Sequence, residues 1–389
     1  MRILLFSASY APVVGGLQTV VHNLAKHLIA RGHDVRVVTN RYPVALPKQE
    51  TIDGVPVDRM LFLKPSVDQL QRHRPDLFAA SFYFGPQSKR QLSALMKEFQ
   101  PDVINVHFPN ESSAILLQLR QQIVFRLVVS LHGHDVYQFN SENGGSNGLH
   151  AKADVLRRLL KSADAVTAVS GDLLGCAKSL DGAVSEKAHV IPNGVDLDRF
   201  SQAAAYKHIR PYVLGAGRLV RSKGFDLLID AFAEARLKEM PDLIIAGTGD
   251  ELEALQQQVS VLKLEDRVLF FGAASSEEVA ALMKGSAAVV VPSRTESFGL
   301  TALEALAARK PLVTTNVGGL KELISVFSGN GHGLHTRIAE VNPTCDSIAA
   351  GLEQVSERVN CEAEQSHDIP PQFHWESVAA AYERVLIPQ

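Results

Sequence analysis

Two glutamates, Glu296 and Glu304, lie eight positions apart in the segment E-S-F-G-L-T-A-L-E, with a glycine between them. If a helix begins near Gly299, Glu296 lies on the loop before it and Glu304 on its second turn. The N–H groups of Gly299, Leu300 and Thr301 would then point out of the helix N-terminus, where free donors and the helix dipole favour an anion. Two carboxylates flanking an anion site suit a ligand with hydroxyls at both ends and phosphate in the middle, such as a nucleotide sugar.

The segment before and after these glutamates supports a ligand site. The apolar run 287–292 ends in proline and is typical of a buried parallel strand, and the loop carrying Ser297 and Phe298 follows it directly. Ligands of open α/β sheets bind at the carboxyl ends of strands. A lone E-x7-E is more often a buried helix with solvated ends, but this context favours the site. A further strand is expected at 311–319, ending in Gly318 and Gly319, and the helix after it, from Leu320, would carry a second set of free N–H groups to the same place.

A second segment with candidate ligand-binding residues lies upstream, at 213–230. Gly215 and Gly217 follow a strand, as in a dinucleotide fingerprint, but Val220 holds the third glycine position and no acidic residue ends the next strand. A nicotinamide site is therefore disfavoured. What remains is a turn with two cations, Arg218 and Lys223, which can clamp a diphosphate, although either one alone would be an ordinary solvated side chain.

Taken together, these motifs resemble those of a retaining glycosyltransferase of family 4. The motifs G-R-L-x-x-x-K-G, A-G-x-G, E-S-F-G-L-x-x-L-E-A-L-A and V-x-G-G occur in order, after an early G-G, L-H-G-H-D, A-V-S and I-P-N-G-V-D-x-x-x-F, so the resemblance covers nearly the whole chain. It implies the α/β GT-B fold, with two Rossmann-like parallel-sheet domains facing a central cleft. It also implies a C-terminal helix that crosses back to the N-terminal domain.

The expected domains are an N-terminal acceptor-binding domain at 1–195, a donor-binding domain at 196–370 and the C-terminal helix at 371–389. The first half shows the expected βα pattern, with a strand at 2–8, a glycine turn at 12–16 and an amphipathic helix after it. The face of the C-terminal helix is predicted to comprise Phe373, Trp375, Val378, Tyr382 and Val385.

Composition agrees with two aliphatic-rich α/β domains. The chain has 389 residues, of which 46% are hydrophobic and 6% aromatic. Three cysteines without metal-ligand spacing suggest a reducing, cytoplasmic setting, and neither a signal peptide nor a membrane-spanning run is expected. Residues 1–195 hold 21 basic and 16 acidic side chains and residues 196–389 hold 18 and 26, a balance that argues against nucleic acid as a partner.

The resemblance also implies the site residues. The catalytic set is His132, Arg218, Lys223 and Glu296, and the donor-binding set is Gly15, Gly16, Arg218, Lys223, Gly247, Gly272, Ala273, Glu296, Ser297, Phe298, Gly299, Leu300, Thr301 and Glu304. Glu296 would contact sugar hydroxyls and Glu304 would accept from the ribose. His132, which alone would be interpreted as a structural histidine, is placed beside the donor sugar. Gly15 and Gly16 would let the backbone approach a phosphate.

No metal or other cofactor is expected. The D-L-D string at 196–198 belongs to the linker motif N-G-V-D-L-D-R-F, so a metal site there is disfavoured. Departure of the nucleoside diphosphate would instead be assisted by Arg218, Lys223 and the amides at Gly299. The acceptor hydroxyl would attack on the face that the diphosphate leaves, with a phosphate oxygen as base, and configuration would be retained without a protein nucleophile.

The donor and acceptor are less defined. Phe271, Gly272 and Ala273 end a strand and could present backbone groups to uracil, which favours UDP over GDP, and the resemblance favours UDP-glucose. A growing exopolysaccharide or a lipid-linked saccharide is the expected acceptor. A UDP-sugar epimerase on the same fold and a non-catalytic sugar-binding protein remain alternatives.

Membrane contact is also left open. A run of basic residues interleaved with Leu92, Leu95 and Met96 could meet anionic lipid at the inner face of the plasma membrane, although a solvated helix face is the commoner explanation. This basic run consists of Lys64, Arg72, Arg74, Lys89, Arg90 and Lys97.

Overall fold

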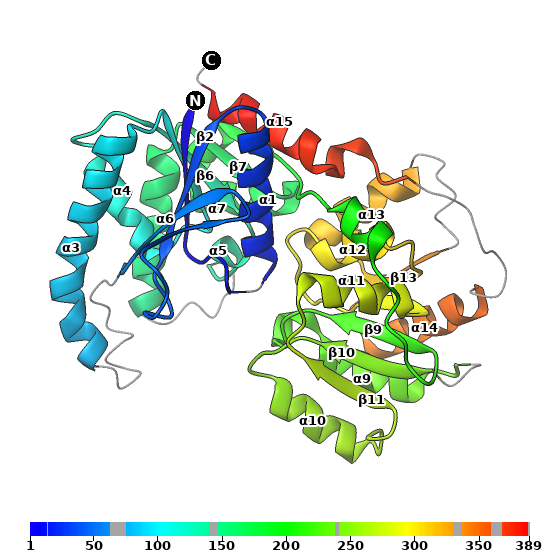
Figure 1. Cartoon of the computed structure of the whole chain (residues 1–389). Coiled ribbons are helices and arrows are strands. Elements are labelled where there is room, and N and C mark those ends of the chain that lie inside the picture. Colours follow the sequence, from blue (N-terminus) through cyan, green and yellow to red (C-terminus); the bar gives the residue numbers. More distant parts are fainter. Residues whose placement is uncertain are drawn as a thin grey trace. The chain divides into compact units, whose positions relative to one another are not determined.

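The computed structural model describes residues 1–13, 15–62, 75–139, 147–237, 241–329, 337–358 and 368–387. The chain forms two compact units (Figure 1). Unit 1 comprises Met1–Asn193 together with Trp375–Gln389, and unit 2 comprises Gly194–His374.

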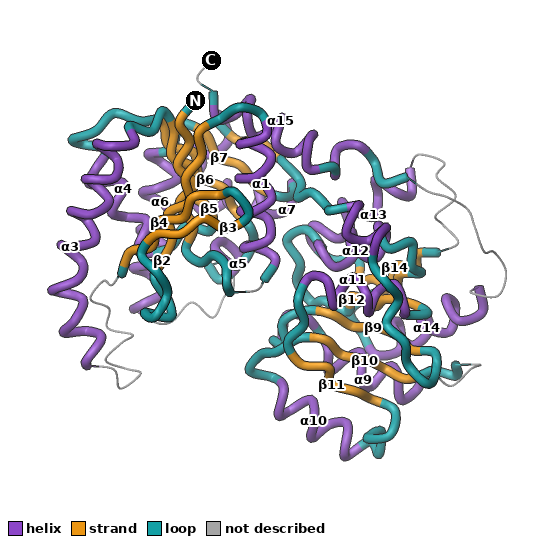
Figure 2. Tube along the Cα trace, in the orientation of Figure 1, coloured by secondary structure: helices purple, strands orange, loops and turns teal. Residues whose placement is uncertain are grey.

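Unit 1 is built on a sheet of eight strands, drawn in orange in Figure 2. In chain order they are β1 (Arg2–Ser7), β2 (Asp34–Asn40), β3 (Gln49–Ile52), β4 (Val55–Met60), β5 (Val103–His107), β6 (Arg126–Leu131), β7 (Ala165–Ala168) and β8 (Ala188–Val190). The spatial order is β3-β4-β2-β1-β5-β6-β7-β8. Among these described strands, only the β3–β4 pair is antiparallel. The central strands are buried on both faces, which is why they read as continuous apolar runs.

Helices connect these strands. They are α1 (Gly16–Ala30), α3 (Pro75–Phe99), α4 (Ala114–Leu119), α5 (His134–Tyr137), α6 (Asn147–Ser162), α7 (Gly171–Leu180) and α15 (Trp375–Leu386). The C-terminal helix α15 packs against α1, where Glu383 accepts from Arg31 Nε at 2.8 Å and bonds His33 Nε2 at 2.9 Å. The predicted return of this helix to the N-terminal unit is therefore confirmed.

One residue of the predicted helix face was misassigned. Phe373 precedes α15 and belongs to unit 2, where its ring stacks on Phe327 with centroids 5.7 Å apart and also contacts Phe298. The chain leaves unit 2 only after this aromatic cluster, so Phe373 anchors the end of unit 2 rather than the helix.

Unit 2 contains a sheet of six parallel strands. They are β9 (Tyr212–Ala216), β10 (Asp242–Ala246), β11 (Val268–Gly272), β12 (Ala288–Val291), β13 (Leu312–Thr315) and β14 (Ile338–Val341), in the order β11-β10-β9-β12-β13-β14. Its helices are α8 (Leu197–Gln202), α9 (Phe225–Glu234), α10 (Leu252–Val261), α11 (Ser276–Gly285), α12 (Leu300–Ala307), α13 (Gly318–Gly329) and α14 (Cys345–Arg358). The strand order reverses between β9 and β12, and ligands of such sheets bind at the carboxyl ends of the strands at this switch point.

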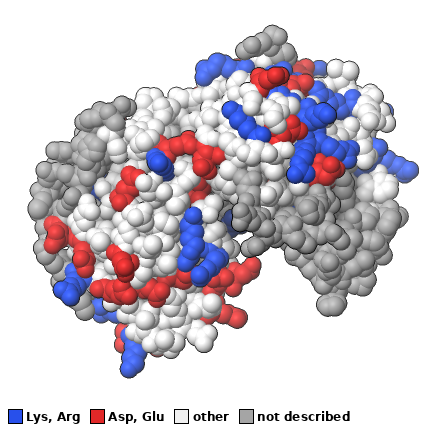
Figure 3. All heavy atoms as spheres, turned by 180° about the vertical axis from the view of Figure 1, so that it is seen from behind, with Lys and Arg blue, Asp and Glu red and all other residues white. Residues whose placement is uncertain are grey.

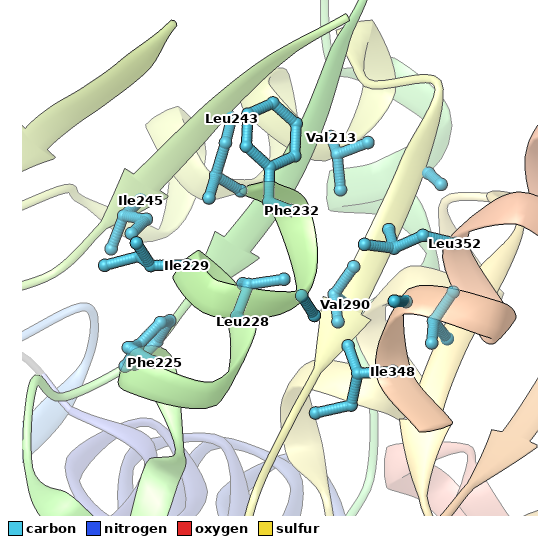
Figure 4. Close-up of a cluster of buried hydrophobic side chains, with 14 of the residues drawn as sticks. Val213, Phe225, Leu228, Ile229, Phe232, Leu243, Ile245, Val290, Ile348 and Leu352 are labelled. Carbon is cyan, nitrogen blue, oxygen red and sulfur yellow. The ribbon is translucent and has the colours of Figure 1, made fainter. Parts of the chain in front are cut away.

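The core of unit 2 fixes the start of α9 beside this switch point. Figure 4 shows Phe225, Leu228 and Phe232 of α9 packed over the strands, with Ile348 and Leu352 of α14 beside them. A Cβ at Gly215 on β9 would lie 3.0 Å from Leu228 and 3.1 Å from Phe225, so helix and strand are in close contact. Burying each such side chain is worth about 1.5–3 kcal/mol, which holds the loop between β9 and α9 in place.

The basic run of unit 1 can be followed only in part. Lys64, Arg72 and Arg74 lie outside the described residues, while Lys89, Arg90 and Lys97 are on α3. Leu92, Leu95 and Met96 are buried in the core, so the interleaved apolar residues do not form an exposed apolar face. This favours the solvated helix face.

Both units carry charged side chains of both signs on the face shown in Figure 3, and acidic side chains are spread across the visible face of unit 2. None of the described helices combines the length and the apolar character that crossing a membrane requires.

Candidate functional site

Two loops at the switch point of unit 2 are in direct contact. One follows β9 and contains the short 3-10 helix Arg221–Lys223, and the other follows β12 from Pro292 onward. Gly224 adopts a left-handed conformation with φ of 70°, and a Cβ on it would lie 2.0 Å from the Pro292 carbonyl oxygen. Ser222 O accepts from the N–H of Arg294 at 2.8 Å. Glycine is therefore required at 224 for both conformation and close approach.

This contact brings two predicted catalytic residues together. The Lys223 ammonium donates to Glu296 Oε2, and the Ser293 hydroxyl lies 3.4 Å from the same oxygen. Both side chains are mostly buried but retain access to solvent. The geometry therefore places a cation and a carboxylate side by side at the carboxyl ends of β9 and β12.

Arg218 lies on the same loop and is exposed. Within the described ranges its side chain makes no hydrogen bond or ion pair, so its guanidinium is available to an anion. On this loop Lys223 is thus paired with Glu296, whereas Arg218 is exposed.

A salt bridge that sequence reasoning missed ties the two loops together. Arg294 donates to both oxygens of Asp226, at 2.6 and 2.7 Å, and Arg221 also donates to Asp226. Burial raises the pKa of Asp226, but the bonds from Arg294 and the charges of both arginines outweigh it and hold that pKa below its usual value. The residues are far apart in sequence, so only the adjacency of β9 and β12 reveals their pairing.

The helix after the second loop begins where the sequence predicted. Gly299 is left-handed, with φ of 99°, and α12 starts at Leu300. In the part of the chain that the structure describes, no acceptor is bonded to the N–H groups of Gly299, Leu300 and Thr301. These donors and the helix dipole make the start of α12 a suitable anion site.

The second set of free N–H groups predicted at the following helix is reduced, because two of its first N–H groups are bonded within the protein. Helix α13 begins at Gly318, and the N–H of Gly319 donates to Glu296 O at 2.9 Å while that of Leu320 donates to Val317 O at 3.0 Å. A Cβ at Gly319 would lie 2.0 Å from Ser297 O. Gly319 and Leu320 at this end of α13 are therefore part of the support of the loop that carries Glu296 and Ser297, and their N–H groups are not available to a ligand.

Glu304 lies on the second turn of α12, half-buried. Burial raises its pKa to about 7, and the charge of Arg199 opposes this shift. No hydrogen bond to its carboxylate occurs among the described residues, which leaves it available to a ligand hydroxyl. The neighbouring Phe298 differs, because its side chain is buried against Phe373 and only its main chain can face a ligand.

The glycines at the ends of β10 and β11 have an internal role. A Cβ at Gly247 would lie 1.8 Å from Gly217 O, and Gly247 N–H donates to Gly272 O at 2.7 Å. The Gly272 carbonyl is therefore engaged within the protein. Ala273 follows it and is exposed, so the backbone beyond β11 is the accessible part of the predicted base pocket.

His132 follows β6 in unit 1, and its main chain is fixed by a buried carboxylate. Asp135 accepts from the N–H groups of His132, at 3.1 Å, and Gly133, at 2.6 Å. Burial raises the pKa of Asp135 to about 7 against these bonds. The ring of His132 lies 3.0 Å from His107, measured from Nε2 to Nδ1, and burial lowers the pKa of His132 to about 4. A neutral imidazole is therefore present at neutral pH.

The remaining predicted residues are placed as follows. Gly15 precedes α1 in an extended conformation and Gly16 is its first residue, so both lie at a helix N-terminus after β1. Asp196, part of the D-L-D string, accepts from Arg199 N–H at 3.1 Å and pairs with the Arg199 side chain. These contacts account for Asp196 as the N-cap of α8.

Two α/β units with largely parallel sheets are the architecture of the GT-B fold. The chain belongs to glycosyltransferase family 4: the profile of Glycosyltransferase Family 4 matches residues 14–199 and that of Glycosyl transferases group 1 matches residues 198–366. The predicted family, fold class and glycosyltransferase activity are confirmed.

Relatives and solved structures span nearly the whole chain. Glycogen synthase of Mycobacterium tuberculosis is 29% identical, covering 100% of this chain and 94% of its own. A GDP-mannose-dependent alpha-(1-6)-phosphatidylinositol monomannoside mannosyltransferase of the same organism is 27% identical, covering 97% and 96%.

Among solved structures, sucrose-phosphate synthase of Thermosynechococcus elongatus has a TM-score of 0.73 at 22% identity, covering 99% and 98% of the two chains. The HepE protein of Anabaena in complex with UDP has a TM-score of 0.68 at 20% identity, covering 99% of both. These two similarities concern the fold.

Proposed function

We propose that the protein is a retaining, metal-independent glycosyltransferase that moves a hexose from a nucleotide sugar, UDP-glucose in the first instance, to a saccharide or lipid-linked acceptor. The observation that carries this proposal is the arrangement at the switch point of unit 2. Lys223, Glu296 and the start of α12 lie together, with Glu304 one turn further along the helix.

Each group has a chemical role in this proposal. The diphosphate is bound by Arg218, Lys223 and the free amides at Gly299, Leu300 and Thr301, which meet the negative charge that develops as the diphosphate leaves. Glu296 accepts from sugar hydroxyls, and Glu304 accepts from the ribose. In the structure, the Lys223 ammonium is paired with the Glu296 carboxylate. When the donor binds, its diphosphate becomes a second anionic partner of the Lys223 ammonium. The Glu296 carboxylate then accepts hydrogen bonds from the sugar hydroxyls.

His132 of unit 1 keeps the role toward the donor sugar that the family resemblance implies. Its lowered pKa makes it a neutral hydrogen-bonding group at neutral pH. A neutral imidazole carries no charge that would attract it to the diphosphate, which Lys223 and Arg218 bind. It therefore remains available to hydrogen-bond to sugar hydroxyls.

The choice of donor rests on the relatives and solved structures. UDP is favoured by the HepE protein, whose solved complex contains UDP, whereas the mannosyltransferase relative uses GDP-mannose. GDP-mannose is therefore the second candidate donor. Glycogen synthase among the relatives favours a saccharide acceptor, and the phosphatidylinositol mannosyltransferase favours a lipid-linked one.

The test is a donor screen in the presence of EDTA. Purified protein is incubated with UDP-glucose, UDP-galactose, UDP-N-acetylglucosamine or GDP-mannose, with binding measured by thermal shift and turnover by release of the nucleoside diphosphate. Proton NMR of the released or transferred sugar distinguishes transfer with retention, transfer with inversion and epimerisation. Binding of none of these donors, or an inverted product, would contradict the proposal.

A further inference from the structure

A buried histidine that the proposed reaction does not use lies directly behind His132. His107 is the last residue of β5, and its side chain is completely buried. Its Nδ1 lies 3.0 Å from His132 Nε2, and the two ring centroids are 5.2 Å apart. A hydrogen bond of this length between imidazoles requires one nitrogen to carry the proton and the other to accept it.

The ring of His107 is enclosed by packing, and its Nε2 has no hydrogen-bond partner among the described residues. One face of the sheet carries a strip of buried polar side chains, in which Ser130 of β6 accepts from Asn105 of β5 at 2.8 Å and from Thr167 of β7 at 2.8 Å. Tyr382 of α15 hydrogen-bonds to Thr167 and Ser130, and its ring centroid lies 6.0 Å from that of His107. His107 is thus enclosed between the sheet and the C-terminal helix.

Two contacts among the described residues contribute to the position of His132. Asp135 fixes its main chain, and His107 contacts its ring nitrogen. Burial lowers the pKa of both histidines, so that both rings are neutral at neutral pH. In a neutral pair with a single proton between the rings, the tautomer of one ring determines the tautomer of the other.

We propose that His107 is a positioning residue for His132, and that its ring, held beneath α15, fixes the orientation and the tautomer in which His132 meets the donor sugar. The effect on turnover rests on the function proposed above, whereas the coupling between the two rings is a property of unit 1 alone. His107 itself does not touch the substrate, because it is completely buried.

Kinetics with three variants test this inference. His107→Leu keeps a similar volume and removes the hydrogen bond, while His107→Asn retains a polar group near the position of Nδ1. Thr39→Val is the matched control, because Thr39 is a buried polar residue of the same sheet whose hydroxyl has no partner among the described residues. We expect His107→Leu to lower kcat by about 10- to 100-fold, the range seen when the hydrogen-bond partner of a metal-binding histidine is removed.

The three variants separate positioning from packing. We expect His107→Asn to recover part of the lost turnover, little change in KM for either variant, and near-wild-type turnover in Thr39→Val. Equal turnover in His107→Leu and wild type, or equal losses in His107→Leu and Thr39→Val, would show that His107 is only a packing residue.

A spectroscopic measurement tests the coupling without any substrate. In protein labelled with ¹⁵N-histidine, the ring nitrogens of His132, assigned by comparison with His132→Gln, report the tautomer directly. Near neutral pH we expect the shifts of a single tautomer in the wild type and of an averaging imidazole in His107→Leu. Averaged shifts in the wild type would overturn the inference, and this outcome needs neither activity nor a His107 variant that folds. A single tautomer together with a failed donor screen would support the positioning role and reject the proposed function.

Discussion

Replacing Gly224 with alanine tests whether the contact between the two switch-point loops places the catalytic groups. At φ of 70°, alanine would have to adopt a left-handed conformation, which costs about 1–2 kcal/mol of stability. Its Cβ would also lie 2.0 Å from the Pro292 carbonyl oxygen, whereas ordinary contact begins at 3.4 Å. The loops must therefore move apart by about 1.4 Å, the difference between these two distances.

That displacement separates Lys223 from Glu296, because each is within four residues of the point of contact. A misplacement of about 1 Å in a catalytic group can lower turnover by about 10²-fold, so we expect at least this loss in Gly224→Ala. Gly32→Ala is the control, since Gly32 has φ of 86° and no atom lies within 4 Å of the place that a Cβ would take. It carries the conformational cost without the clash.

The assay measures turnover of the donor identified by the screen, together with chemical unfolding of each variant. We expect a similar conformational loss of stability in both variants, an added loss in Gly224→Ala and normal turnover in Gly32→Ala. If Gly224→Ala turned over like Gly32→Ala, the loop contact would not position the site and the reasoning from this glycine would be refuted.

Three further predictions concern the same site. Arg218→Ala and Lys223→Ala should each lower kcat by about 10²- to 10³-fold with the fold preserved by circular dichroism, because each removes a charge that stabilises the leaving diphosphate; near-wild-type kcat would exclude that residue from the site. Activity should survive EDTA, and complete loss restored by Mn²⁺ alone would contradict the mechanism. The raised pKa of Glu304, about 7, means that its carboxylate forms as pH rises through that value, so donor affinity measured by calorimetry should increase there in the wild type and stay flat in Glu304→Gln. A donor affinity of the wild type that does not change with pH would refute the role of Glu304 in donor binding. Because the folded state binds the extra proton between pH 4.5 and about 7, the contribution of Glu304 to the unfolding free energy should fall as pH rises over this interval.

The sequence predicted those parts of the fold that depend on local pattern. The sequence correctly placed the strand 287–292, the loop after it and the helix that begins beside Gly299. It could do so because β-branched runs, proline and glycine influence the backbone conformation of only a few neighbouring residues. The edge strand β3, Q-E-T-I, was missed, since its polar composition carries no strand signal and its pairing with β4 determines its conformation.

Contacts between distant segments could not be predicted in the same way. The partners Lys223 and Glu296 are separated by 73 positions, and only the adjacency of β9 and β12 brings them together. His107 appeared in the sequence as the end of an apolar strand, V-I-N-V-H, and no spacing rule connects it to His132. Parallel pairing of β5 and β6 places the ends of these strands side by side.

The return of α15 to unit 1 has a consequence for the order in which the protein is made. Unit 2 is an insertion within unit 1, and its ends are tied together where Val195 N–H donates to Phe373 O at 2.9 Å. A ribosome therefore completes residues 194–374 before Trp375 and Tyr382 exist to cover the sheet of the earlier unit. Domains generally fold as units during synthesis, the N-terminal one first. Here unit 2 has its full sequence before unit 1 does, and the surface around His107 stays uncovered until the final helix arrives.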